Sequence, residues 1–262
     1  MAQIWIGITP KSGSVFGRRQ QARADAVFIA GGDQSNYVQF WKGTALDRTL
    51  QGLMARQVPM GGTSAGMAVL GQFDFTAARG TVTSTQALSD PYNKYMTLDP
   101  SPLSLSGGFL TPAALRNTIL DAHLDSRDRM GRLMTFVARL VAPANGMGCT
   151  GGILTAGTSA STGARGIGVD VEAALLVQGN GPNQPYTARR VTNVSTVSDS
   201  AVYFVRPLLG ASTCAPGQAL TLRNVEVRKL ADSATVFNLS DWSGVAPYYV
   251  DVIDGTLTSS PY

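Results

Sequence analysis

The stretch VPMGGTSAGMAVL, residues 58–70, decides the fold. Its first residues are apolar, as in a short buried strand, residues 62–66 form a GxSxG pentapeptide, and residues 67–70 favour the start of a helix. A GxSxG motif between a strand and a helix lifts its serine above the end of a sheet. Free N–H groups and the helix dipole at such a turn favour negative charge. The motif alone also fits a plain glycine turn, but its context favours Ser64 as a nucleophile and the amide of Ala65 as an oxyanion donor.

The residues before this stretch predict alternating strands and helices. Residues 26–30 are continuously apolar and run into the GGDQ sequence at 31–34, as a strand buried on both faces runs into a turn. Helical spacing of apolar residues follows over 36–56, and a further strand is expected at residues 4–9. Strand and helix alternation is typical of a parallel sheet, so the predicted class is α/β.

The rest of the chain is predicted in coarser terms. Residues 73–109 lack periodicity and are expected to be loops, and residues 146–168 form a small-residue segment that is mobile by composition. Thr111 and Pro112 suit the first positions of a helix over 111–120, and a second helix is expected over 127–140. Strands are expected in the last third at 173–177, 201–205, 220–227 and 248–253.

Composition excludes several classes of protein. The chain has 262 residues, 44% hydrophobic and 15% charged, which is typical of a globular protein. Its formal net charge is +4, but basic residues are not concentrated in runs, which argues against a nucleic-acid partner. No apolar run is long enough to cross a membrane. Cys149 and Cys214 fit no metal spacing, so no metal or cofactor is expected, and they are either a disulfide or two buried thiols.

A serine nucleophile needs a base, and the chain has a single histidine, His123. A lone histidine is more often a packing or surface residue than a catalytic one. Here it lies in the segment DAHLDSRDRMGRL, residues 121–133, among arginines that could bind carboxylates. An ordinary solvated helix face is the alternative.

Four ordered blocks resemble cyanophycinases and related aspartyl dipeptidases. They are FIAGGDQ at 28–34, GTSAG at 62–66, DAHLDSRDRMGRL at 121–133 and GIGVD at 166–170. The resemblance implies the fold of class I glutamine amidotransferases, a flavodoxin-like, mainly parallel sheet with helices on both faces. It also implies a Ser–His–Glu triad. Residues 1–180 would form the hydrolytic core and 181–262 a β-rich extension packed on the same domain.

Carried onto this sequence, the resemblance implies three groups of site residues. The catalytic residues are Ser64, His123 and Glu172; the oxyanion hole is formed by Gly32, Asp33 and Ala65; the substrate-binding residues are Gln34, Asp121, Arg127, Arg129 and Arg132. The implied reaction is hydrolysis of cyanophycin, an arginine-bearing polyaspartate, to β-Asp-Arg dipeptides through an acyl-enzyme. A homodimer is also plausible from the family.

Three departures from the family keep alternatives open. The family glutamate directly follows the aspartate of its GIGxDE block, whereas Val171 stands there and Glu172 comes one residue later, so Asp170 is a second candidate for orienting His123. Ala122 replaces a cleft glutamine of one branch. The family's elements before the GGDQ block are largely missing, which suggests a fragment or an incorrectly assigned start codon. An aspartyl dipeptidase and a non-catalytic relative are therefore alternatives, and the location, cytoplasmic or secreted, is left open.

Overall fold

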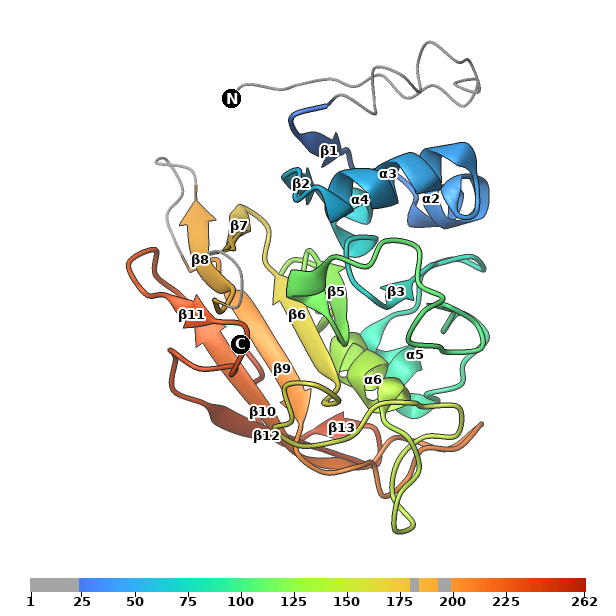
Figure 1. Ribbon diagram of the computed structural model, residues 1–262. Coiled ribbons are helices and arrows are strands. Elements are labelled where there is room, and N and C mark those ends of the chain that lie inside the picture. Colours follow the sequence, from blue (N-terminus) through green and yellow to red (C-terminus); the bar gives the residue numbers. More distant parts are fainter. Residues whose placement is uncertain (1–23, 180–183, 193–198) are drawn as a thin grey trace.

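The computed structural model describes residues 24–179, 184–192 and 199–262. It contains helices and strands in a mixed α/β arrangement, with the early elements at one end of the molecule and a larger sheet below them (Figure 1). The α/β class is thus confirmed. The strand expected at residues 4–9 lies outside the described residues.

The first part of the fold surrounds Ser64. Strand β1 (Val27–Ile29) pairs in parallel with β2 (Met60–Gly62), as the alternation predicted. The single helix expected over 36–56 is wrong: there are two, α2 (Gln34–Trp41) and α3 (Ala45–Ala55). Gly43 between them has φ +75°, and the Thr44 side chain accepts hydrogen bonds from the first amides of α3, so a new helix starts there. The short helix α4 (Ala65–Ala68) follows Ser64.

The main sheet has six strands in the order β13-β12-β10-β9-β6-β5. Their bounds are β5 Thr118–Ala122, β6 Arg165–Val169, β9 Val202–Pro207, β10 Leu222–Leu230, β12 Tyr248–Ile253 and β13 Thr256–Leu257. Only β5 and β6 pair in parallel, and every other pairing in this sheet is antiparallel. The sheet is therefore mixed rather than mainly parallel, and the flavodoxin-like classification is not confirmed.

Two sequence predictions fail at β5 and β6. The helix expected over 111–120 is replaced by a short 3-10 turn, η1 (Ala113–Leu115), and by β5, all five residues of which are buried. A short apolar run suits a buried strand as well as a buried helix, and here the pairing with β6 decides. The segment 146–168, expected to be mobile, ends in β6, which is also fully buried.

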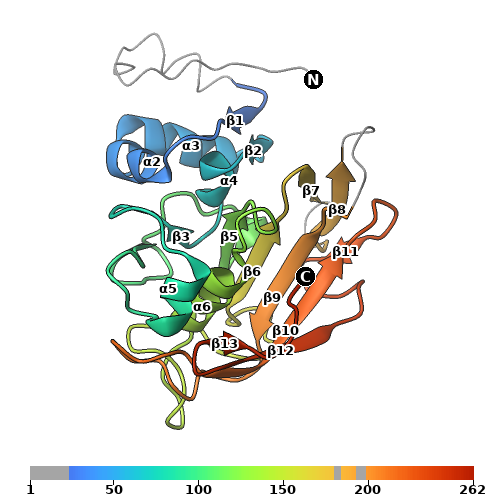
Figure 2. The same ribbon diagram turned by 180° about the vertical axis from the view of Figure 1, so that it is seen from behind.

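The two faces of the six-stranded sheet are covered differently. Helix α6 (Met130–Leu140) packs on β6 and β9, and α5 (Ser84–Ser89) packs on α6 (Figure 2). The other face is covered by a small antiparallel sheet, where the Phe237 ring stacks on Phe204 of β9 with centroids 3.7 Å apart. That sheet consists of β7 (Ala173–Gln178), β8 (Thr187–Thr192) and β11 (Phe237–Asn238). Leu53 of α3 and Val69, directly after α4, lie in the same apolar cluster as Phe204 and Phe237.

Smaller features complete the fold. The region 73–109, expected to be loops, holds a two-stranded pairing of β3 (Asp74–Phe75) with β4 (Leu98–Asp99) in addition to α5. Helix α6 confirms the helix expected over 127–140, with a later start. Cys149 and Cys214 form a disulfide, with Cα atoms 5.2 Å apart, that joins the segment after α6 to the segment before β10. Of the two alternatives for the cysteines, the structure has the disulfide.

Candidate active site

Ser64 lies on a sharp turn between β2 and α4. Its φ is +50° and its ψ is −116°, a conformation that a residue with a side chain rarely adopts. The flanking glycines make the turn possible: a Cβ on Gly62 would lie 2.3 Å from the Gly66 carbonyl oxygen, and one on Gly66 would lie 2.1 Å from the Ile29 carbonyl oxygen. The backbone is therefore packed so closely that neither position accepts a side chain, and the Ser64 hydroxyl is held away from the chain.

His123 meets this hydroxyl. It directly follows β5, has φ +56°, and its ring Nε2 lies 2.9 Å from Ser64 Oγ. Partial burial lowers the pKa of the imidazole, and the positive charges of Arg127 and Arg129 lower it further. The ring is consequently neutral at neutral pH, and a neutral ring with Nδ1 protonated can accept the hydroxyl proton at Nε2. The two residues that the sequence analysis paired are brought together.

The third member of the expected triad is not brought to His123. Glu172 is exposed, with φ +69°, in the turn between β6 and β7. Asp170 is buried, but its two carboxylate oxygens accept the backbone N–H groups of Asp125 (3.2 Å) and Ala201 (2.8 Å). Over the described parts of the chain, no side chain hydrogen-bonds to His123 Nδ1. Asp170 therefore supports the turn that follows His123 instead of the imidazole itself.

The residues expected to form the oxyanion hole surround Ser64. A Cβ placed on Gly31, next to Gly32, would lie 3.2 Å from Ser64 Cβ, so the loop after β1 runs directly beside the serine. In the portion of the chain that is described, the amides of Gly32, Asp33 and Ala65 donate no hydrogen bond. The Asp33 side chain accepts the N–H of Ser35 at 2.9 Å and so starts α2. Unpaired amides beside a serine hydroxyl can receive the oxygen of a bound carbonyl group.

The three arginines differ in the hydrogen bonds and ion pairs that they make within the protein. Arg132 is 2% exposed and binds both carboxylate oxygens of Asp121, at 2.7 and 2.6 Å, and it also donates to Thr81 Oγ1 at 3.0 Å. Arg129 donates to the Ala122 carbonyl at 2.7 Å, and burial lowers its pKa to about 10. Arg127 is exposed and has no ion pair or hydrogen bond in the described residues. Asp121 thus pairs with Arg132 and lies 3.7 Å from Arg129 as well, so one carboxylate serves two arginines, and Arg127 has no acidic partner among the described residues.

A pocket of about 250 Å³ opens at this place. Its walls hold most of the predicted site residues: Gly32, Asp33, Gln34, Ser64, Ala65, Asp121, Arg127, Arg129 and Arg132. Gln34 also donates to the Phe75 carbonyl at 3.3 Å. His123 and Glu172 are not among its wall residues. The walls also include residues of the 73–109 region, among them Thr81, which sequence reasoning missed because that region has no periodicity or motif.

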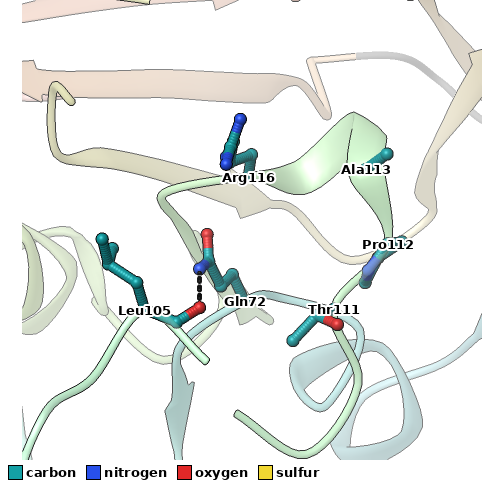
Figure 3. A pocket seen from close by; sticks show the side chains of 6 residues that line it. All are labelled: Gln72, Leu105, Thr111, Pro112, Ala113 and Arg116. Atoms are coloured by element: carbon teal, nitrogen blue, oxygen red, sulfur yellow. Dashed lines mark hydrogen bonds between the residues drawn. The ribbon is translucent and has the colours of Figure 1, made fainter. Parts of the chain in front are cut away.

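A second cavity, of about 310 Å³, lies at the other end of β5 (Figure 3). Gln72 lies in it with its side chain fully engaged, donating to the Leu105 carbonyl at 2.8 Å and accepting the N–H of Asn117 at 2.6 Å. Arg116 and Thr111 are its other polar wall residues. It holds no serine, histidine or carboxylate, so it offers no comparable chemistry.

Two further properties of the described residues bear on function. They contain no group of three or more His, Cys, Asp or Glu side chains that could hold a metal ion. Among their helices, none is both long and apolar enough to span a bilayer.

Serine hydrolases use this arrangement: a serine on a tight strand-to-helix turn that is hydrogen-bonded to an imidazole and flanked by unpaired amides. The comparison of the sequence with known families gives a narrower result. The family model of peptidase family S51 matches residues 18–98, which confirms the resemblance to the cyanophycinase and aspartyl dipeptidase family and supports a peptidase. The match includes the GGDQ block and Ser64 and stops before His123. No curated protein matches the chain.

Proposed function

We propose that this chain is a serine-type peptidase that hydrolyses cyanophycin or a similar aspartyl peptide through an acyl-enzyme. The single observation that carries the proposal is the 2.9 Å contact between Ser64 Oγ and His123 Nε2 at the edge of an arginine-lined pocket. A hydroxyl at this distance from a neutral imidazole can be deprotonated as it attacks.

The reaction would proceed in two halves. Ser64 Oγ attacks the carbonyl carbon of the scissile bond while His123 Nε2 takes its proton, and the carbonyl oxygen becomes an oxyanion that the amides of Ala65 and of the Gly32–Asp33 loop stabilise. The imidazolium returns the proton to the leaving amine, and an ester to Ser64 remains. Water then attacks this ester, with His123 again as the base, and releases the acid and the free serine.

The charge of the pocket supports a substrate that bears carboxylates. Asp121 is paired with Arg132, so Arg127 and part of Arg129 remain available to a ligand. A guanidinium binds a carboxylate through two parallel N–H groups, which suits aspartyl and arginyl carboxylates alike. Cyanophycin and dipeptides with an N-terminal aspartate both offer such groups, and turnover of the two compared under identical conditions would separate a cyanophycinase from an aspartyl dipeptidase.

The decisive test of the proposal is Ser64→Ala. The variant should lose turnover of cyanophycin and of Asp-X dipeptides by at least about 1,000-fold, because the nucleophile is gone, while substrate binding persists. Ser106→Ala, which changes an exposed serine away from the pocket, should keep full turnover. Appreciable turnover by Ser64→Ala would reject the serine mechanism.

One observation favours a second candidate, a non-catalytic relative that binds aspartyl peptides without cleaving them. His123 Nδ1 has no carboxylate partner in the described residues, and Glu172 points to solvent instead. A fluorophosphonate probe distinguishes the two, because it reacts only with an activated serine. Labelling of Ser64 in the folded wild-type protein supports the peptidase, and absence of labelling supports the binding protein.

A further inference from the structure

The side chain of Tyr262 contacts the turn that follows His123. Its hydroxyl lies 3.1 Å from the Leu124 carbonyl oxygen, 3.0 Å from Asp128 Oδ1 and 3.2 Å from the backbone nitrogen of Met130. The phenol has one proton, so it donates to Asp128 or to Leu124 while it accepts the N–H of Met130. One group, 138 residues away from Leu124 in sequence, thus contacts both ends of the segment that follows His123.

The segment that carries Tyr262 is itself held by contacts with strands of the main sheet. Tyr248 of β12 donates its hydroxyl to the Pro261 carbonyl at 2.7 Å, and the rings of Tyr203 and Tyr262 meet edge to face with centroids 5.9 Å apart. Tyr262 is 36% exposed, and the partial burial of its phenol raises the pKa above the usual tyrosine value, as does the neighbouring Asp128. The phenol therefore keeps its proton and remains a hydrogen-bond donor.

The segment needs such support because its own backbone is unfavourable. His123 has φ +56° and Asp128 has φ +45°, and both carry side chains. Helix α6 starts at Met130 with no side-chain cap, so the Tyr262 hydroxyl supplies the partner for a buried N–H that would otherwise lack one. Without the hydroxyl, the turn would lose contacts at Leu124, Asp128 and Met130 together.

We propose that Tyr262 is a positioning residue for His123: its hydroxyl fixes the 124–130 turn and thereby keeps the imidazole within reach of Ser64. The inference deepens the proposed function and rests on it. Tyr262 does not touch the pocket, so its effect reaches the reaction only through the position of the imidazole.

The test compares Tyr262→Phe, which removes only the hydroxyl, with Tyr249→Phe, a matched change of a 52% exposed tyrosine on β12. Three quantities are measured for each: kcat and KM on cyanophycin or Asp-X dipeptides, the rate of fluorophosphonate labelling at Ser64, and the melting temperature. Tyr262→Phe should lower kcat and the labelling rate about 10-fold and leave KM within about twofold, because positioning is lost and binding is not. Tyr249→Phe should match the wild type.

A readout independent of turnover is available because the chain has one histidine. NMR of the imidazole therefore gives a single titration curve, that of His123. In Tyr262→Phe the measured pKa should move up towards the ordinary histidine value as the freed turn exposes the ring, while Tyr249→Phe leaves it unchanged.

The outcomes separate the two proposals. A lower melting temperature with unchanged kcat, labelling rate and His123 titration would overturn the positioning role and leave Tyr262 as a stabilising residue only. If the wild type neither turns over substrate nor labels, the proposed function fails, and the NMR comparison alone then decides whether Tyr262 positions the imidazole.

Discussion

Ser64 and His123 are held in place by different means. The conformation of Ser64 depends on neighbours within the stretch 58–70 and on the strand β1 beside it. Gly62 lets the chain approach the backbone of Gly66, and Gly66 lets it approach the backbone of Ile29. The turn after His123 is supported by Asp170 and Tyr262, which come from distant parts of the chain, while Asp121, two residues before His123, pairs with Arg132 of the next helix. The position of Ser64 thus depends mainly on local sequence, and that of His123 on tertiary contacts. Substitutions around the two residues should therefore have different effects.

The largest effect is expected on the Ser64 side. Gly66→Ala places a Cβ 2.1 Å from the Ile29 carbonyl oxygen, a contact that only movement of the backbone can relieve, so the variant should lose turnover and several kcal/mol of stability. Gly52→Ala is the matched control: nothing lies within 4 Å of its Cβ, and in the middle of α3 it should gain about 0.5–1 kcal/mol. Thermal and urea unfolding measure both. A Gly66→Ala protein as stable and active as the wild type would refute the local account of the turn.

The next largest effect is expected at the buried ion pair on the His123 side. Arg132→Met removes both short hydrogen bonds of the buried Asp121, two residues before His123, and leaves it only the longer contact with Arg129, so the variant should cost about 3–5 kcal/mol of unfolding free energy. Arg223→Met breaks an ion pair with Asp251 that is largely exposed, and should cost less than about 1 kcal/mol. Urea denaturation compares the two. Equal costs would mean that the Asp121–Arg132 pair does not support this part of the fold.

A smaller effect is expected at Asp170. Asp170→Asn places an amide NH₂ group opposite one of the two backbone N–H groups that the carboxylate accepts. The variant should lose about 1–3 kcal/mol of unfolding free energy. Its kcat should also fall, because the turn after His123 loosens. Burial raises the pKa of Asp170 to about 6, so the folded protein holds this proton more tightly than the unfolded chain does. Wild-type stability should therefore fall as the pH rises from about 4 to 6, and the variant should lack that component. Identical slopes in the two proteins would contradict this.

The smallest effect on the Ser64–His123 pair itself is expected for Arg127, whose charge adds to burial in lowering the pKa of His123. The imidazole accepts a proton only when neutral, so activity should appear as the pH rises through its pKa. Arg127→Gln should raise that pKa and move the acid limb of the kcat/KM profile to higher pH. Arg116→Gln, an exposed arginine at the second cavity, should leave the limb where it is. A limb that moves equally in both variants would show that Arg127 has no special influence.

The same contrast explains what the sequence could predict. Strands β1 and β2 and the Ser64 turn could be predicted, because their signals are local: an apolar run, two glycines and a helix start. The helix expected over 111–120 was wrong, because Thr111 and Pro112 imitate a helix start while the buried residues after them pair with β6. His123 was proposed because it is the single histidine and lies in the arginine-bearing block 121–133 that resembles the family, whereas its distance from Ser64 has no local signal. Nothing in the sequence around Tyr262 or Thr81 indicates their contacts, since both act across long distances in the chain.

The Cys149–Cys214 cross-link has a practical consequence for producing the protein. It closes a 65-residue span around β6 and β9, and such a closure contributes about 4 kcal/mol by limiting the unfolded chain. Much of the six-stranded sheet lies within or beside that span. Protein made in a reducing host would lack the disulfide and would therefore be considerably less stable. Expression in an oxidising compartment, or refolding with a glutathione couple, should therefore raise the yield of soluble protein, and free-thiol titration would track it.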